Sequence, residues 1–211
     1  ALFCVVFTSM LNAQWIIQNS GLSPSPNPEV RFSVVDENVC WGIKNISSEF
    51  IRTTDGGANW NASTIQGAAG LGGTSISSFD SNIAWAAMHD LAGVLSGGIF
   101  KTTDAGVNWT RDTSAFQGSG GHPNVIHFFD QNNGVVLGNP HDGNWEIYTT
   151  TDGGSQWNRV LSSKIPAPVT GDFAFEGVFE SKGNRLMFGT WKGSFYLTTD
   201  KGNTWSATRN L

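Results

Sequence analysis

The stretch that decides the fold is Thr53–Trp60, which reads TTDGGANW. It returns as TTDAGVNW at 102–109, as TTDGGSQW at 150–157 and as TTDKGNTW at 198–205. The aspartates of successive copies are separated by 49, 48 and 48 residues. A fixed period of this length is typical of arrays in which each repeat folds as one supersecondary unit, as in solenoids and propellers. The sequence therefore predicts four structural repeats.

Each repeat contains the same four short runs of β-forming residues. In the first repeat they are Phe32–Asp36, Val39–Lys44, Phe50–Thr54 and the segment that begins at Trp60. Gly, Asn, Asp and Ser bound these runs, as expected for strands joined by tight turns. Four antiparallel strands per repeat make one propeller blade. The predicted fold class is all-β, a β-propeller fragment over 14–211 with blades at about 31–64, 75–113, 124–161 and 173–209.

The repeated turn has a mechanical explanation. It joins the third strand of each blade to the fourth, and its glycine can supply the positive φ that such a turn demands. The aspartate can accept backbone N–H bonds inside the turn, and the tryptophan can pack between sheets. We therefore predict structural rather than catalytic roles for Asp55, Gly57, Trp60, Asp104, Gly106, Trp109, Asp152, Gly154, Trp157, Asp200, Gly202 and Trp205.

The pattern Thr-x-Asp-x-Gly-x-x-Trp resembles the Asp-box, also called the BNR repeat. The longer blade pattern, Phe79–Trp85 followed by a Thr-Thr-Asp turn, is most similar to that of photosystem II stability/assembly-factor propellers. Sialidase, endoglucanase-type and sortilin propellers resemble it more distantly. The resemblance covers residues 31–209. It implies the fold and, from bacterial relatives, secretion, but propellers host many unrelated activities.

Composition excludes several classes of function. Charged residues make up only 14%, the net charge is −5, and no Lys/Arg-rich run occurs, so a nucleic-acid partner is not expected. The two cysteines, Cys4 and Cys40, have no motif spacing. No metal site and no cofactor are predicted. No segment after the N-terminus is long and apolar enough to span a bilayer.

The N-terminus indicates the compartment. Residues 1–13, ALFCVVFTSMLNA, are typical of the last part of a secretory signal peptide, with a buried strand as the alternative. Residues 14–19 resemble a fourth strand without its blade, which predicts the closing strand of a missing last blade, with a linker after the signal segment as the alternative. We therefore expect a fragment of a larger, for example seven-bladed, propeller that is monomeric and extracytoplasmic, at the cell surface or in the periplasm.

Candidate binding residues gather at one end of the predicted blades. The connections between blades and the turns between second and third strands open on the same end, here called the loop face. The connections at 113–124 and 162–172 are longer than a tight turn needs, and excess loop length often carries function. The repeated turns lie at the opposite end. The binding-face candidates are His89, His122, His141 and Trp191, with a protein or polysaccharide as ligand.

Four acidic residues on the same face are weak catalytic candidates: Asp90, Asp142, Asp172 and Glu176. Glu176 is aligned with Phe32, Ile76 and Ile126 of the other repeats, and a carboxylate at an apolar position breaks the local rule. With Asp172 it could form a carboxylate pair for glycoside hydrolysis, whereas a solvated strand start is the alternative. His127, aligned with Gly177, is expected to have a structural role.

The sequence favours a secreted, non-catalytic binding or assembly scaffold. The first alternative is a carbohydrate-active hydrolase that uses carboxylates of the loop face, and the second is peptide binding of the sortilin kind. The resemblance to sialidases implies three arginines around a substrate carboxylate. Neither Arg31 nor Arg185 has the Arg-Ile-Pro context of those enzymes, which argues against a sialidase.

Overall fold

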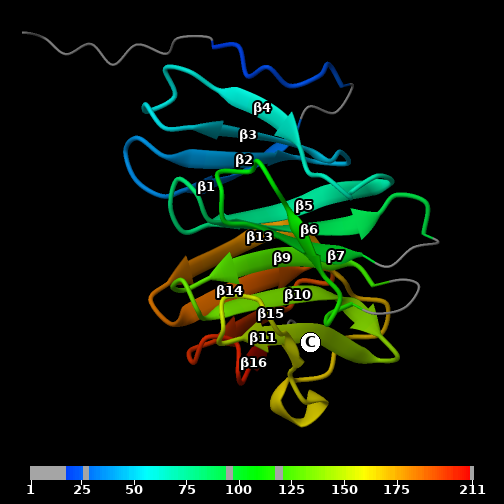
Figure 1. The fold of residues 1–211 in the computed structure, drawn as a ribbon. Helices are drawn as coiled ribbons and strands as arrows, with labels where there is room; N and C mark the ends of the chain where they lie inside the picture. Colours follow the sequence, from blue (N-terminus) through cyan, green and yellow to red (C-terminus); the bar gives the residue numbers. More distant parts are fainter. Residues whose placement is uncertain (1–17, 26–28, 94–96, 117–120, 210–211) are drawn as a thin grey trace, which may run out of the picture.

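The structure is a computed structural model that describes residues 18–25, 29–93, 97–116 and 121–209. The strands form four four-stranded sheets, each built from strands consecutive in the chain. Figure 1 shows how these sheets are arranged in space. Apart from one short 3-10 helix, η1 at Ser162–Lys164, the regular elements of the described residues are strands. In this part of the chain no helix has the length and apolar character needed to cross a membrane.

Every sheet is an antiparallel meander. Blade 1 comprises β1 (Val30–Val34), β2 (Cys40–Lys44), β3 (Glu49–Thr53) and β4 (Asn61–Thr64). Blade 2 comprises β5 (Leu71–Ser78), β6 (Ala84–Asp90), β7 (Gly98–Thr102) and β8 (Thr110–Asp112). Blade 3 comprises β9 (Pro123–Phe128), β10 (Gly134–His141), β11 (Asn144–Thr150) and β12 (Asn158–Arg159). Blade 4 comprises β13 (Ala174–Lys182), β14 (Arg185–Thr190), β15 (Phe195–Thr198) and β16 (Ser206–Thr208).

The first strand of each blade is the inner one. β5 contacts β1 and β9, and β13 contacts both β9 and β5. This arrangement confirms the all-β prediction of four antiparallel blades in a β-propeller. The second strands of blades 2 and 3 are buried on both faces because these blades lie between two neighbours, so Val135, Val136 and Leu137 of β10 are all inaccessible to water.

The core lies between the blades as three separate apolar layers. Trp41 and Phe50 of blade 1 pack on Trp109 of blade 2, with ring centroids 6.4 and 5.4 Å from it. Trp85 of blade 2 stacks on Phe128 of blade 3 at 3.5 Å. A third layer joins blades 3 and 4. A single sheet cannot bury these rings by itself. Their burial between neighbouring blades therefore contributes most of the apolar stabilisation of the fold.

Each of the four repeated turns forms the same hydrogen-bonded clasp. In blade 3 the Thr150 hydroxyl donates to Asp152 Oδ1 at 2.8 Å and accepts the Gly154 N–H at 2.9 Å. Asp152 Oδ1 also accepts the backbone N–H of Gln156 at 3.0 Å. The same three bonds recur in the other blades. The aspartate oxygens are therefore used inside the turn, as a structural role would require, and that role stays a prediction.

The turn requires two successive residues at positive φ. The second is the expected glycine, as at Gly106 with φ of 84°. The first is Gly56 or Gly153 in two blades but Ala105 and Lys201 in the others. The sequence pattern did not reveal that the first of the two residues also has a positive φ, since alanine and lysine seldom adopt this conformation.

The two ends of the propeller are built from different turns and strand ends. Each repeated turn donates a backbone N–H to the turn between the first and second strands of its own blade, as from Gly56 to the Asn38 carbonyl at 3.0 Å. These turns together make the turn face. The starts of the inner strands and the ends of the second strands lie at the opposite end, the loop face. This separation of the two ends agrees with the expectation from the sequence.

The predicted signal segment, residues 1–13, lies outside the described residues. The same holds for residues 14–17 of the expected closing strand, and no strand is assigned at Gln18 and Asn19. Both expectations therefore stay predictions.

Candidate functional site

A cavity of about 710 Å³ opens on the loop face. Its walls come from blades 1, 3 and 4, so no single repeat could form it. The lining combines charged, amide and aromatic side chains: Glu29, Arg31, Asn45, His122, Asn139, Phe173, Ala174, Phe175, Glu176 and Val178. Ligand sites typically have this composition, with an apolar wall and a few convergent polar groups.

Glu176 reaches the cavity because β13 is irregular. The pairing of β13 with β14 shifts register between Ala174 and Phe179, and Gly177 within this stretch has a φ of 61°. A Cβ at Gly177 would lie 2.7 Å from Arg31 Cδ and 2.9 Å from the Thr74 carbonyl oxygen. Only glycine therefore fits there, and the resulting bulge sets the direction of Glu176.

The register also corrects two alignments made from the sequence. Phe179, not Glu176, occupies the position of Phe32, Ile76 and Ile126, because each of these residues pairs with the equivalent residue of its second strand. The predicted substitution of an apolar residue by a carboxylate was therefore wrong. By the same register, the counterpart of His127 is Glu180 rather than Gly177.

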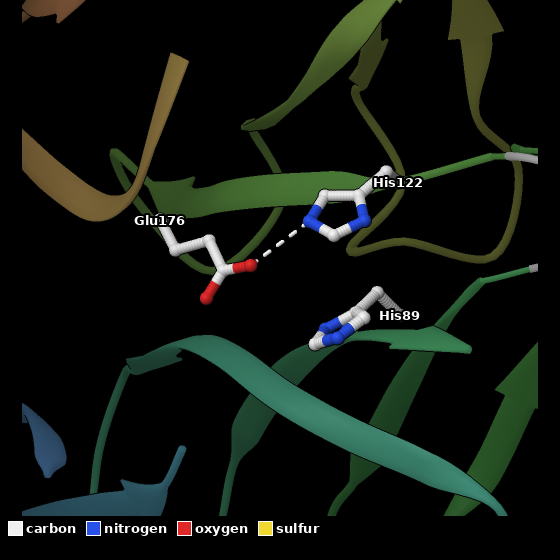
Figure 2. Close-up of side chains that lie close together, drawn as sticks. All are labelled: His89, His122 and Glu176. Carbon is white, nitrogen blue, oxygen red and sulfur yellow. Dashed lines mark hydrogen bonds and ion pairs between the residues drawn. The ribbon is translucent and has the colours of Figure 1, made fainter. Parts of the chain in front are cut away.

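Three titratable side chains from three blades converge beside the cavity (Figure 2). Glu176 Oε1 lies 2.9 Å from Nε2 of His122, which immediately precedes β9. The ring of His89, at the end of β6, lies 4.4 Å from the ring of His122, centroid to centroid. One potential ligand atom from each of the three residues lies within 4.8 Å of the others. Within the described ranges, no other group of His, Cys, Asp and Glu converges in this way.

The environment sets the charge of two members of this cluster. Burial lowers the pKa of His89, and the neighbouring His122 lowers it further, so the His89 imidazole is neutral at neutral pH. Burial opposes ionisation of Glu176, but the hydrogen bond with His122 and the basic groups around the carboxylate, Arg31 among them, outweigh it. The pKa of Glu176 is therefore lowered, and the residue is a carboxylate.

A second carboxylate belongs to the same cavity. Glu29, directly before β1, accepts a hydrogen bond from Arg31 and another from Asn45 Nδ2 at 3.0 Å. Arg31 Nε is buried and has no hydrogen-bond partner. Glu29, Arg31 and Asn45 were not predicted as site residues, because nothing in their spacing distinguishes them from surface residues.

Three exposed aromatic rings form a shelf at the edge of the cavity, here called the aromatic shelf: Phe173, Phe175 and Trp191. Trp191 is 64% exposed and stacks on Phe173 at 5.5 Å with an interplanar angle of 14°. Phe175 meets Trp191 edge-on at 5.9 Å. Phe173 and Phe175 also line the cavity. Exposed aromatic groups that lie together, rather than singly, mark interaction surfaces.

Asp172 does not join Glu176 in a carboxylate pair. It is 5% exposed and accepts three hydrogen bonds, from the Thr190 hydroxyl at 2.6 Å and from the N–H groups of Phe173 and Lys192. The Thr190 hydroxyl also accepts the Ser194 N–H, as the turn threonines do on the other face. Asp172 therefore closes the turn that carries Trp191, and its predicted catalytic role is not supported.

The remaining candidates lie apart from the cavity. His141 and Asp142 form an exposed pair, with His141 Nδ1 3.3 Å from Asp142 Oδ2, beside a smaller cavity of about 330 Å³. Asp90 ends β6 and accepts the Ala92 N–H at 3.1 Å. His127 lies between Phe129 and Phe179, where burial lowers its pKa to about 4, in keeping with a structural role.

No protein-family model and no curated protein matches the chain. Several solved structures are similar in fold. YCF48 from Cyanidioschyzon merolae superposes with a TM-score of 0.61 at 16% identity, over 89% of this chain and 59% of that protein. The likeness is one of fold.

Glycoside hydrolase propellers are similar to the same degree. The GH74 enzyme of Niastella koreensis has a TM-score of 0.61 at 14% identity, over 84% of this chain and 30% of the enzyme. The GH74 xyloglucanase of Xanthomonas campestris has a TM-score of 0.56 at 16% identity, over 88% of this chain and 28% of the enzyme. The chain thus spans less than two thirds of each of these three proteins.

Proposed function

We propose that this chain is a non-catalytic binding propeller that holds a polysaccharide at the cavity of its loop face. The observation that carries the proposal is the aromatic shelf beside a polar cavity. A sugar ring offers an apolar C–H face and a rim of hydroxyls. The exposed ring of Trp191 can pack on the apolar C–H face. The amide and carboxylate groups of Asn45, Asn139 and Glu29 can bind the hydroxyls.

The charge state of Glu176 supports binding rather than hydrolysis. Glycoside hydrolases use one carboxylic acid whose raised pKa keeps it protonated until it protonates the leaving oxygen. The pKa of Glu176 is lowered instead, and its oxygen is already bonded to His122. Asp172, the expected second carboxylate, is buried within a turn.

Two further parts of the proposal rest on the sequence. The repeated turn supports membership among Asp-box propellers, because the clasp explains the threonine, the aspartate and the glycine of the pattern. The apolar run Leu2–Phe7 followed by Ala13 supports export, so we propose an extracytoplasmic site of action. A polysaccharide ligand is consistent with such a location.

A second candidate function is glycoside hydrolysis, because two carboxylates, Glu29 and Glu176, line one cavity. The fold similarity to GH74 enzymes makes a plant-type β-glucan a reasonable probe for both candidates. The two differ in one measurable respect, the release of reducing ends.

We expect the protein to be retarded in native gels that contain xyloglucan or a related β-glucan, without release of reducing sugar. Trp191→Ala is expected to weaken this binding at least about tenfold, which corresponds to about 1.4 kcal/mol, because it removes the exposed ring of the shelf. Phe79→Ala is the matched control, since Phe79 is also an exposed ring, at 41%, but lies in a turn of the opposite face.

Equal loss of binding in both variants, or none in Trp191→Ala, would contradict the proposed site. Release of reducing sugar by the wild-type protein, lost in Glu176→Gln, would show that the function is hydrolysis rather than binding. Capture of peptides from a library, with no polysaccharide retained, would replace the polysaccharide by a peptide ligand.

A further inference from the structure

The cluster of His89, His122 and Glu176 has features that a hydrogen-bonded structural group does not need. The three side chains come from β6, from the residue before β9 and from β13, so three blades each direct one potential ligand to a common point (Figure 2). The cluster also borders open space, because His122 and Glu176 line the cavity.

The distances suit a metal ion of the size of zinc. Zinc bonds to imidazole nitrogen and carboxylate oxygen are about 2.0–2.2 Å, so tetrahedral ligand atoms lie about 3.4 Å apart. On zinc binding, the distance between His122 Nε2 and Glu176 Oε1 would increase from 2.9 Å by a few tenths of an ångström. The largest separation between ligand atoms, which is at most 4.8 Å, would decrease by little more than one ångström. Rotation of the side chains can supply changes of this size without moving the blades.

One polar atom of the cluster lacks a partner. His89 Nδ1 is buried and makes no hydrogen bond. Such a group costs free energy unless something binds it, and buried unsatisfied atoms in native structures call for a bound water, a bound ion or a functional role. Among the described residues, the other buried side-chain atoms without a partner belong to arginine, asparagine and tryptophan, so His89 Nδ1 is the one that comes from a histidine or a carboxylate.

A positive charge next to the cluster would oppose a cation. Arg31 lines the same cavity, but it is paired with Glu29, and this pairing reduces its repulsion of a cation.

We propose that His89, His122 and Glu176 form a binding site for a divalent transition-metal cation, with Zn²⁺ as the representative ion. Two imidazoles favour zinc and its neighbours over Mg²⁺ and Ca²⁺, which prefer all-oxygen sites. Three protein ligands leave a fourth position for water or for a ligand oxygen from the cavity. This inference goes beyond the proposed polysaccharide binding and does not depend on it.

The test is calorimetric titration of ZnCl₂ into tag-free protein that has been dialysed against EDTA and then against buffer at neutral pH. We expect saturable uptake of one zinc ion per chain and none of Mg²⁺. His89→Ala and Glu176→Gln are each expected to weaken zinc binding by at least about 100-fold, because removing a ligand exceeds the 10- to 100-fold effect of removing a supporting group. His141→Ala is the matched control, since His141 also adjoins a carboxylate but lies outside the cluster.

A second readout does not depend on heat. Co²⁺ in place of Zn²⁺ is expected to give the visible absorption of a low-coordinate site, lost in Glu176→Gln, which preserves the shape of the side chain and hence the fold. Circular dichroism verifies folding of each variant. Absence of saturable zinc uptake by the wild-type protein would overturn the proposal. So would zinc binding that persists in both cluster variants, or that disappears in His141→Ala.

Discussion

Replacing Glu49 with glutamine is expected to lower the free energy of unfolding by about 1.5–3 kcal/mol, the usual contribution of a hydrogen bond between charged groups, because Lys44 is buried but Glu49 is partly exposed. Lys44 is 5% exposed, and its Nζ donates to Glu49 Oε2 at 2.5 Å, to the Ser23 hydroxyl at 2.7 Å and to the Ser23 carbonyl at 2.9 Å. Glutamine keeps the shape but leaves the ammonium without a counter-charge. Chemical unfolding followed by tryptophan fluorescence measures the change.

Two controls accompany this prediction. Glu180→Gln alters an exposed carboxylate on β13 and is expected to change stability by less than about 0.5 kcal/mol. Replacing Lys44 and Glu49 together by methionine is expected to recover much of the loss, because no buried charge then remains. A loss below about 1 kcal/mol in Glu49→Gln would contradict the assigned role of the pair.

The same pair predicts an acid limb of stability. Burial alone would raise the pKa of Glu49, but the hydrogen bonds from Lys44 and Ser23 outweigh it and lower this pKa to about 2. Because the pKa in the folded state lies below that of the unfolded chain, near 4.5, the unfolded state binds more protons between these values. The stability from the pair is therefore full above about pH 4.5 and is lost as the pH falls toward about 2. Glu49→Gln should flatten this limb.

Gly106→Ala is expected to destabilise the protein by about 2–5 kcal/mol, from a backbone cost of about 1–2 and an overpacking cost of about 1–3. Gly106 has a φ of 84°, and an added Cβ would lie 2.5 Å from Phe50 Cζ and 2.7 Å from Phe50 Cε2. The methyl group would thus press into the layer between blades 1 and 2. The measurement is again the midpoint of chemical unfolding.

Gly57→Ala separates the two contributions. Gly57 holds the same position of the same turn in blade 1, with a φ of 87°, but its Cβ would meet nothing nearer than Trp60 Nε1 at 3.5 Å. It should therefore show only the backbone cost of about 1–2 kcal/mol. Equal losses in the two variants would mean that the repeated turn does not pack against the preceding blade as the structure has it.

The fold could be predicted from the sequence because each blade depends on residues that are close together in the chain. The clasp needs a threonine, an aspartate and a glycine within five residues, and all four copies keep them at nearly constant spacing. The β-propeller class and the structural role of the turn followed from that pattern. The positive φ of Ala105 and Lys201 did not, since it depends on the whole turn rather than on the residue.

The site was harder to predict because it is assembled from distant residues. His122 and Glu176 are 54 positions apart, and neither their spacing nor that of His89 resembles a ligand motif. Gly177 was the available signal, since a glycine within a strand often marks a bulge. Read in that way, it would have shown that Glu176 lies outside the regular register. The convergence with His89 and His122 depends on how the blades pack, which repeat patterns do not encode.

We propose that function belongs to the loop face and that the repeated turns only build the blades. Hydrogen-exchange mass spectrometry, with and without xyloglucan or the related β-glucan that retards the protein most, distinguishes the two faces. We expect protection in peptides that cover 121–126, 171–180 and 189–193, and no change at 53–60, 102–109, 150–157 and 198–205. Protection confined to the four turns, or no retardation by any of these β-glucans, would contradict the proposal.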